Sequence, residues 1–492
     1  MKKLGLVVLL GTLVLSGCVK DMPLLSELSD SVPAEGKLID TISIPAPKMY
    51  TPDDVHAAKV SVMARSVGEA PIDDLRQYAQ GILDKIIAVA PPGAPTAEIV
   101  LIANSGPGAR AAREGVVFLY HSAFDYLRSE DELAFLIAHE YSHVLMQHTP
   151  DNLFSMLRPY LLTAADFAVG SQTNQTDLFQ KMGQMYGSDL ILRDLILPNW
   201  DRSQERVADH LGLDLMVKAG YQPKGASGYF EVAKEAEERF GANYEITRNN
   251  LELFLQAQFQ PQGQDNALLN QFLSELGNAV DTIQQKLAAK HDDAAERAEE
   301  IFAYGLREYM PERSSRMMHK DAFDSVIKRN KATLENYRIA SEILQSLQSD
   351  DSEIDFRDLE NDARKAVSGL TANHPYPRWA FAKVRERQGN LSKAAQNIDL
   401  IGNGEVLALP VEMKRAEILK ALGKVQPAFE RVEDVATYYD WPLEAYRFMY
   451  PIVKASGNKA RENELLIGCV TRYPQQRALC AGQSSAGQMV GM

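Results

Sequence analysis

Two histidines and a glutamate carry the strongest chemical signal in this chain of 492 residues. His139, Glu140 and His143 form the pattern His-Glu-x-x-His, and histidines four residues apart share one face of a helix. Two neutral imidazoles at this spacing can bind one Zn²⁺ ion at about 2.1 Å. Zinc lowers the pKa of water from about 15.7 to about 7, and Glu140 is placed to take the proton as general base. The alternatives are an uninvolved pair of surface histidines, or a structural zinc site, which would need no base.

The residues before the motif predict a helix that presents it. Ser129 and Glu132 have the spacing of a capping box, in which Ser129 is the N-cap. Apolar residues then recur at helical spacing as far as His139. Two short β-rich stretches, residues 98–102 and 115–119, come earlier, and residues 51–90 are patterned as helix. We therefore expect a small sheet that packs on helices.

A catalytic zinc ion takes three protein ligands and keeps a fourth position open. The best third candidate lies in residues 201–209, at the start of a predicted helix that Gly220 and Pro223 end. Glu205 and Asp209 share a face of that helix. A Glu-x-x-x-Asp pair is by itself usually a solvated helix face, so the residues alone do not decide between the two interpretations.

The order of the motifs resembles the HtpX and CAAX-prenyl-protease family of gluzincin metallopeptidases, over about residues 50–310. The matching segments are His139-Glu140-x-x-His143, Glu205-x-x-Ala208-Asp209-x-x-Gly212 and Ala219-Gly220-Tyr221-x-Pro223. The resemblance implies one Zn²⁺ per chain, with His139, His143 and Glu205 as ligands. It implies that Asp209 orients a zinc-binding histidine.

A further family element is His291 followed by Arg297, with Asp292 where the family has proline. The resemblance places His291 near the zinc and Arg297 in the active-site cleft, as catalytic residues beside Glu140. His291 would either stabilise the oxyanion or coordinate zinc and keep the enzyme latent. Residues 108–111 occupy the place of the family's substrate-binding edge strand, with Gly108 in place of asparagine.

The first residues are patterned as a targeting segment. Lys2 and Lys3 precede a short apolar stretch, and residues 15–18 resemble a bacterial lipobox that ends at Cys18. This predicts a lipoprotein signal peptide over 1–17, lipidation of Cys18 and a tether over 18–50. The resemblance to sorting signals, with Val19 after the cysteine, predicts a periplasmic protein that is lipid-anchored to the outer membrane. A plain signal peptide is the alternative.

The tail has a period of 34 residues, because Gly389, Gly423 and Gly457 are spaced by that number. This resembles the tetratricopeptide repeat (TPR), with an irregular helical bundle as the alternative. The expected fold is α+β but mainly α: a minigluzincin metalloprotease domain with a small β-sheet over 51–348, then an α-helical TPR-like solenoid over 349–492. Cys469 and Cys480 are predicted to form a disulfide bond rather than two buried thiols.

The function expected from these features is a zinc metalloendopeptidase. A protease followed by TPR-like repeats resembles BepA-type periplasmic peptidases, which implies unfolded or misassembled envelope proteins, including outer-membrane proteins, as substrates. A partner in the assembly machinery would bind the repeats. The net charge of −14 argues against nucleic acid as a partner. The alternative function is a chaperone or assembly adaptor that acts through the repeats, with a latent protease site.

Overall fold

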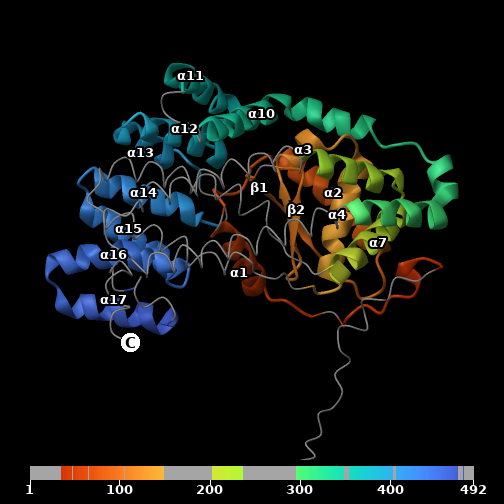
Figure 1. Ribbon diagram of the computed structural model, residues 1–492, viewed down its shortest axis with the longest axis horizontal. Coiled ribbons are helices and arrows are strands. Elements are labelled where there is room, and N and C mark those ends of the chain that lie inside the picture. Colours follow the sequence, from red (N-terminus) through yellow and green to blue (C-terminus); the bar gives the residue numbers. More distant parts are fainter. Residues whose placement is uncertain are drawn as a thin grey trace, which may run out of the picture.

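A computed structural model describes residues 35–46, 48–64, 66–104, 106–148, 202–236, 295–347, 354–402, 406–474 and 480. Figure 1 shows one half built around a small sheet and, beside it, a stack of helices that contains the C-terminal part of the described chain. The predicted class, a mainly helical α+β fold with a small sheet, is confirmed. The predicted boundary at residue 348 stays a prediction.

The sheet has three strands in the order β1-β3-β2. β1 (Glu98–Ile102) pairs parallel with β3 (Val116–Tyr120), and β2 (Ala109–Ala112) pairs antiparallel with β3 at one edge. The first two strands match the predicted ones. β2 lies where the family resemblance placed an edge strand. Its Ala-rich composition has no strand signal of its own, and its pairing with β3 decides the conformation.

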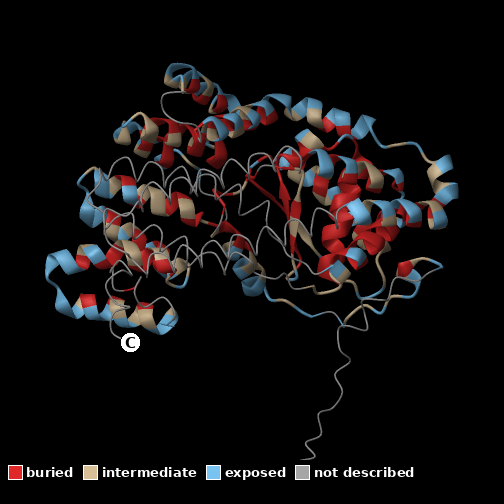
Figure 2. Ribbon diagram, in the orientation of Figure 1, coloured by how far each residue is buried: buried red, intermediate tan, exposed pale blue. Residues whose placement is uncertain are grey.

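Both faces of the sheet are covered. Alternate residues of β1 and β3, such as Ile99 and Val117, belong to the main core with α2 (Asp73–Val89) and α4 (Glu130–Leu145). The opposite set, such as Val100 and Phe118, packs with α1 (Pro52–Met63). This period of two is what a sheet buried on both faces requires. Figure 2 shows buried residues concentrated around the sheet and α4.

The helical region predicted for residues 51–90 is two helices, α1 and α2, because the chain reverses at Gly68, whose φ is +125°. The main core also contains residues of η2 (Leu38–Asp40), α7 (Arg202–Lys218), helical residues 295–315 and α10 (Asp321–Ser346). It continues into α11 (Phe356–Ala366), α12 (Pro375–Arg387), α13 (Leu391–Asp399) and α14 (Leu409–Ala421). η4 (Gly369–Asn373) is a short turn between α11 and α12. One apolar interior therefore connects the half around the sheet to the helix stack. α3 (Ala123–Tyr126) is a single turn between β3 and α4.

The C-terminal helices follow one another in a regular stack (Figure 1). They are α12 and α13 (Leu391–Asp399), α14 (Leu409–Ala421) and α15 (Val425–Tyr438), and α16 (Leu443–Ser456) and α17 (Lys459–Arg472). The three glycines at the 34-residue spacing each have φ between 72° and 77°, and each separates the two helices of a pair. A left-handed residue after a helix favours glycine, which explains the period. That the pairs are TPR-like repeats stays a prediction.

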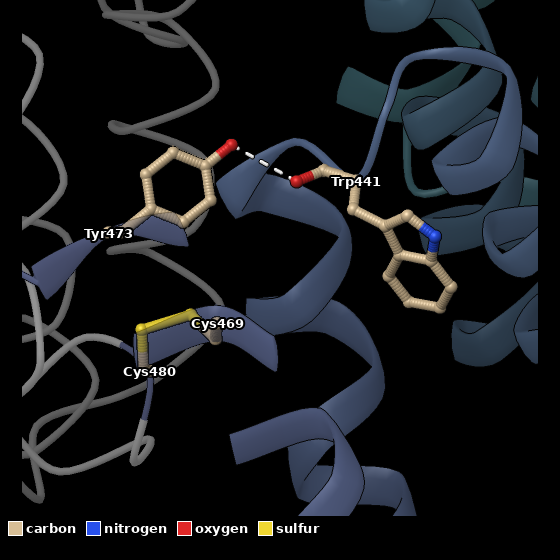
Figure 3. Close-up of a disulfide and its surroundings, with 4 residues drawn as sticks. All are labelled: Trp441, Cys469, Tyr473 and Cys480. Carbon is tan, nitrogen blue, oxygen red and sulfur yellow. Dashed lines mark hydrogen bonds between the residues drawn. A yellow bond between two sulfur atoms is a disulfide. The ribbon is translucent and has the colours of Figure 1, made fainter. Parts of the chain in front are cut away.

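The predicted disulfide bond between Cys469 and Cys480 is present. Cys469 lies on α17 and both sulfur-bearing residues are buried. Beside it, the Tyr473 hydroxyl donates to the Trp441 carbonyl at 3.0 Å (Figure 3). None of the helices in the described ranges is both long enough and apolar enough to cross a lipid bilayer.

Candidate active site

The helix that carries the His-Glu-x-x-His motif begins as the sequence indicated. Ser129 is the N-cap of α4, and its hydroxyl accepts the N–H of Glu132 at 3.3 Å. The second half of the expected capping box is displaced by one residue, because the Glu132 carboxylate accepts the N–H of Arg128 at 2.6 Å. The Glu132 carboxylate thus still accepts a hydrogen bond from a backbone N–H at the start of the helix. Every residue of α4 is buried.

α7 crosses α4 at close range. A Cβ atom at Gly212 of α7 would lie 2.9 Å from the backbone nitrogen of His139 and 3.0 Å from its Cα. Only glycine tolerates such an approach of two helices. The crossing brings the acidic start of α7 over the middle of α4, so Glu205 and Asp209 face the two histidines.

The three predicted ligands come together. The Nε2 atoms of His139 and His143 are 3.2 Å apart, and they lie 3.7 and 3.8 Å from the Glu205 carboxylate oxygens Oε2 and Oε1. All three ligand atoms lie within 4.8 Å of one another, and all three residues are buried. Two imidazole nitrogens and one carboxylate oxygen converging on one point are a donor set that zinc prefers.

Asp209 and Arg297 surround this cluster. The Asp209 Oδ1 atom lies 2.9 Å from Nδ1 of His139, which leaves Nε2 directed to the cluster. Arg297 donates to both Asp209 oxygens at 2.7 and 2.9 Å, and its Nη1 atom lies 2.6 Å from Glu205 Oε2. Burial by itself raises the pKa of Asp209, but Arg297 and His139 outweigh it and lower that pKa to about 2. Asp209 is therefore charged, and it fixes the orientation of the imidazole.

Glu140 is the residue without a complete set of partners. Its Oε2 atom is buried and, within the described residues, accepts no hydrogen bond. Burial raises the pKa of this carboxylate to about 7, and the charge of His139 acts in the opposite direction. An unsatisfied buried carboxylate is costly unless a cation or water occupies the space beside it.

The charges of the cluster favour a divalent cation. Glu140, Glu205 and Asp209 contribute three negative charges when ionised, and Arg297 contributes one positive charge, while burial lowers the pKa of His143 far below its ordinary value. With both histidine ligands neutral, as zinc binding requires, two negative charges then remain uncompensated. The residues present therefore fit Zn²⁺ in the type of donor, in the convergence of the donors and in charge.

The structure also adds residues that the sequence did not single out. His148 lies with Nδ1 2.9 Å from Nδ1 of His143. His148 comes five residues after His143, a spacing that would place it on a different face if α4 continued. α4 ends at Leu145, however, and Gln147 has a left-handed conformation (φ 54°) that turns the chain back toward His143. Tyr229 lies on helical residues 224–236, and its ring centroid is 5.4 Å from that of Phe135 of α4, at a tilt of 52°. Glu140 and Arg297 are among the charges that act on its hydroxyl.

Two predicted residues lie outside the described ranges, so their placement stays a prediction: His291 and Cys18. Arg297 is in place, but its side chain is only 12% exposed and is held by the two carboxylates. Arg297 is therefore placed to hold the carboxylates of Glu205 and Asp209 in position.

β2 runs beside this site. The Tyr120 N–H donates to the Gly108 carbonyl at 3.2 Å, so in the register of β2 and β3 the backbone groups of Arg110 and Ala112 point to β3. Those of Ala109 and Ala111 point to the outer edge, which no strand of the described residues pairs with; we call it the free edge. A hydrogen bond from the Ala111 backbone acts on Glu140, which places the free edge next to the proposed base. The strand that the family resemblance placed at residues 108–111 is thus at a sheet edge.

The chain is similar to curated proteins over part of its length. It is 27% identical over 164 residues to the mitochondrial metalloendopeptidase OMA1 of Schizosaccharomyces pombe, which is 33% of this chain and 45% of that protein. It is 26% identical over 126 residues to the mitochondrial metalloendopeptidase OMA1 of Saccharomyces cerevisiae, which is 25% of this chain and 32% of that protein. The chain thus spans less than half the length of either relative.

These relatives contradict the predicted location. We expected a periplasmic protein anchored by lipid to the outer membrane, but both relatives are named as mitochondrial. The prediction rested on residues 2–19 alone, where a positive start and a short apolar stretch occur in more than one kind of targeting segment. That location is therefore withdrawn.

The family itself is clear. The family model of peptidase family M48 matches residues 74–387, which is more than half of the chain and includes every described residue of the cluster. With the converging donors, this confirms at the level of the family the predicted enzyme class, a zinc metalloendopeptidase. The chain belongs to peptidase family M48.

Proposed function

We propose that this chain is an endopeptidase that cleaves extended segments of unfolded or misassembled proteins at a zinc site formed by His139, His143 and Glu205. The observation that carries the proposal is the juxtaposition of this buried donor set with the free edge of β2. An unfolded chain can add to such an edge as a further strand, through backbone hydrogen bonds that do not depend on sequence. A folded protein has its backbone groups already paired and would not bind in this way.

The chemistry follows from the positions of the side chains. Zinc, when bound, polarises the scissile carbonyl and makes water more acidic. Glu140 takes the proton from the attacking water and delivers it to the leaving amine. Asp209 holds the His139 ring in the orientation that directs Nε2 to the ligand cluster, and Arg297 holds the carboxylates of Asp209 and Glu205. Positioning contacts of this kind typically change metal affinity or activity by about 10–100-fold.

Metal content and proteolysis test the proposal together. We expect one zinc per purified chain, hydrolysis of casein, and loss of hydrolysis with retained zinc in Glu140→Gln. Glu205→Ala should lose both. Glu300→Gln is a matched control, because Glu300 lies on the neighbouring helical residues 295–315 and forms an exposed pair with Arg206. A Glu140→Gln protein that digests casein as fast as the unchanged chain contradicts the assignment.

A second function, a chaperone or assembly adaptor with a latent protease, is favoured by the regular stack of α12–α17. The stack would bind a protein partner or deliver substrate to the protease. Truncation after residue 442 removes α16 and α17 and leaves the protease half intact. If cells need the stack but tolerate Glu140→Gln, the adaptor is the main function. If cells need Glu140 and tolerate the truncation, proteolysis is the main function. Retained zinc content shows that the truncated chain is folded.

A further inference from the structure

A cavity of about 330 Å³ lies where α3, α10 and helical residues 224–236 meet. Its volume is at the low end of the range of ligand pockets, which leaves room for one long side chain. The lining residues that matter here are Gly106, Asp125, Tyr126, Arg128, Val232 and Arg338.

The two cations of this cavity are already neutralised. Arg128 donates to both oxygens of Glu235 at 2.7 and 2.8 Å and lies 3.5 Å from Glu231. Arg338 pairs with Glu335 at 2.6 Å and also with Glu342. Two positive charges thus meet four negative ones, before Asp125 is counted.

Asp125 is the carboxylate of this cavity that is not paired with Arg128 or Arg338. In the part of the chain that the structure describes, its side chain has neither an ion pair nor a hydrogen bond, and it is open to the cavity. Asp125 is exposed to solvent, so a ligand can reach its carboxylate from outside. At pH 8 the cavity therefore has an excess of negative charge and one carboxylate able to accept hydrogen bonds from a cation.

The cavity lies near the start of β2 and the start of α4. Gly106 comes three residues before β2 and five before Ala111, which neighbours Glu140, so the chain between them spans at most about 16 Å. Arg128 directly precedes the N-cap Ser129 of α4, and Glu140 is eleven residues, or about 16 Å, further along. Both separations correspond to four or five residues of extended peptide.

We propose that this cavity is a substrate subsite that takes a lysine or arginine side chain four or five residues from the scissile bond. The inference rests on the proposed endopeptidase function. The aliphatic stem would lie along Val232 and the ring of Tyr126, and the charged head would reach Asp125. The paired guanidinium groups of Arg128 and Arg338 keep the cavity walls in place.

Fluorogenic peptides test the subsite. A single lysine is moved along an otherwise neutral peptide, and each peptide is matched by one with norleucine at the same position. At pH 8 we expect kcat/KM to favour lysine about tenfold at one position four or five residues from the cleaved bond, which corresponds to about 1.4 kcal/mol. Asp125→Asn should bring that ratio close to one. Asp73→Asn, which removes one exposed charge from α2, should keep it.

Binding gives an independent measurement. The dissociation constants of the lysine and norleucine peptides are compared on Glu140→Gln, with and without Asp125→Asn, by fluorescence anisotropy. Equal binding of the two peptides, or an unchanged preference in Asp125→Asn, overturns the subsite. If the unchanged chain cleaves no peptide, the proposed endopeptidase function fails instead, and the binding ratio still decides whether Asp125 selects a basic side chain.

Discussion

The contacts of Arg297 with Glu205 and Asp209 join helical residues 295–315 to α7, and they allow a quantitative prediction of the free energy of unfolding. Arg297 is 12% exposed, and its partners Glu205 and Asp209 are 9% and 1% exposed. Arg297→Met keeps the bulk of the side chain but leaves two buried carboxylates without their cation. Breaking a buried pair from one side typically costs about 3–5 kcal/mol, because the remaining charge is not solvated.

The same two helices contain their own control. Arg206 contacts Glu300 through two nitrogens at 2.6 and 2.8 Å, which is the same forked geometry, but these side chains are 45% and 25% exposed. Exposed pairs contribute about 0–1 kcal/mol. Arg206→Met should therefore change the free energy of unfolding by less than 1 kcal/mol.

The assay is urea denaturation followed by circular dichroism, in the presence of a chelator so that metal does not contribute to stability. The free energies of unfolding of both variants are compared with that of the unchanged chain. A difference between the two variants of at least 2 kcal/mol is expected. Equal losses for Arg297→Met and Arg206→Met would refute the argument that burial, rather than the geometry of the contact, determines the contribution of Arg297.

Four further predictions follow from individual contacts. Asp209→Asn should weaken zinc binding about 10–100-fold in a competition with a chromogenic chelator, because the His139 ring loses its orienting partner, whereas the exposed Asp84→Asn should not. Burial lowers the pKa of His121 to about 3, so the folded state resists protonation that the unfolded state accepts below about 6.5. The contribution of His121 to stability should be complete above that value and fall by about 2 kcal/mol between pH 7 and pH 5. It is measured as the difference between the unchanged chain and His121→Gln, because the raised pKa values of Glu140 and Asp214 act in the opposite direction; an equal pH dependence of the two proteins argues against this. Replacing both Cys469 and Cys480 by alanine should cost about 3 kcal/mol in thermal or urea unfolding, as the loop between them is short, and no loss would show that packing alone holds that end. His291→Ala should keep its zinc in metal analysis yet change turnover: a rise indicates latency, a fall indicates oxyanion stabilisation, and an unchanged rate removes His291 from the mechanism.

The parts of the site that the sequence predicts are those with a local pattern. The spacing of His139 and His143 places both on one face of a helix, and the cap at Ser129 marks where that helix starts. Glu205 could not be separated from an ordinary acidic pair by spacing, and only the resemblance to a family distinguished it. The reason is physical: the contact between α4 and α7 is formed by residues far apart in the chain.

Other features depend on tertiary contacts that leave no periodic signal. β2 is a strand because it pairs with β3, although Arg110 and its alanine neighbours have little preference for strands. His148 reaches His143 because the chain turns back after α4, which a helical extrapolation does not foresee. The cavity around Asp125 brings together four segments from separate parts of the sequence.

The missing side chain at Gly212 has a consequence for metal selectivity. Ligand distances in metal sites must be correct to within about 0.2 Å, and here the ligands come from two helices whose spacing is set by backbone touching backbone. A single methyl group at this position would widen that spacing by more than the coordination sphere tolerates, while every ligand remained. The absence of a Cβ atom at residue 212 therefore contributes to the choice of metal ion, because it sets the distance between the two helices that supply the ligands.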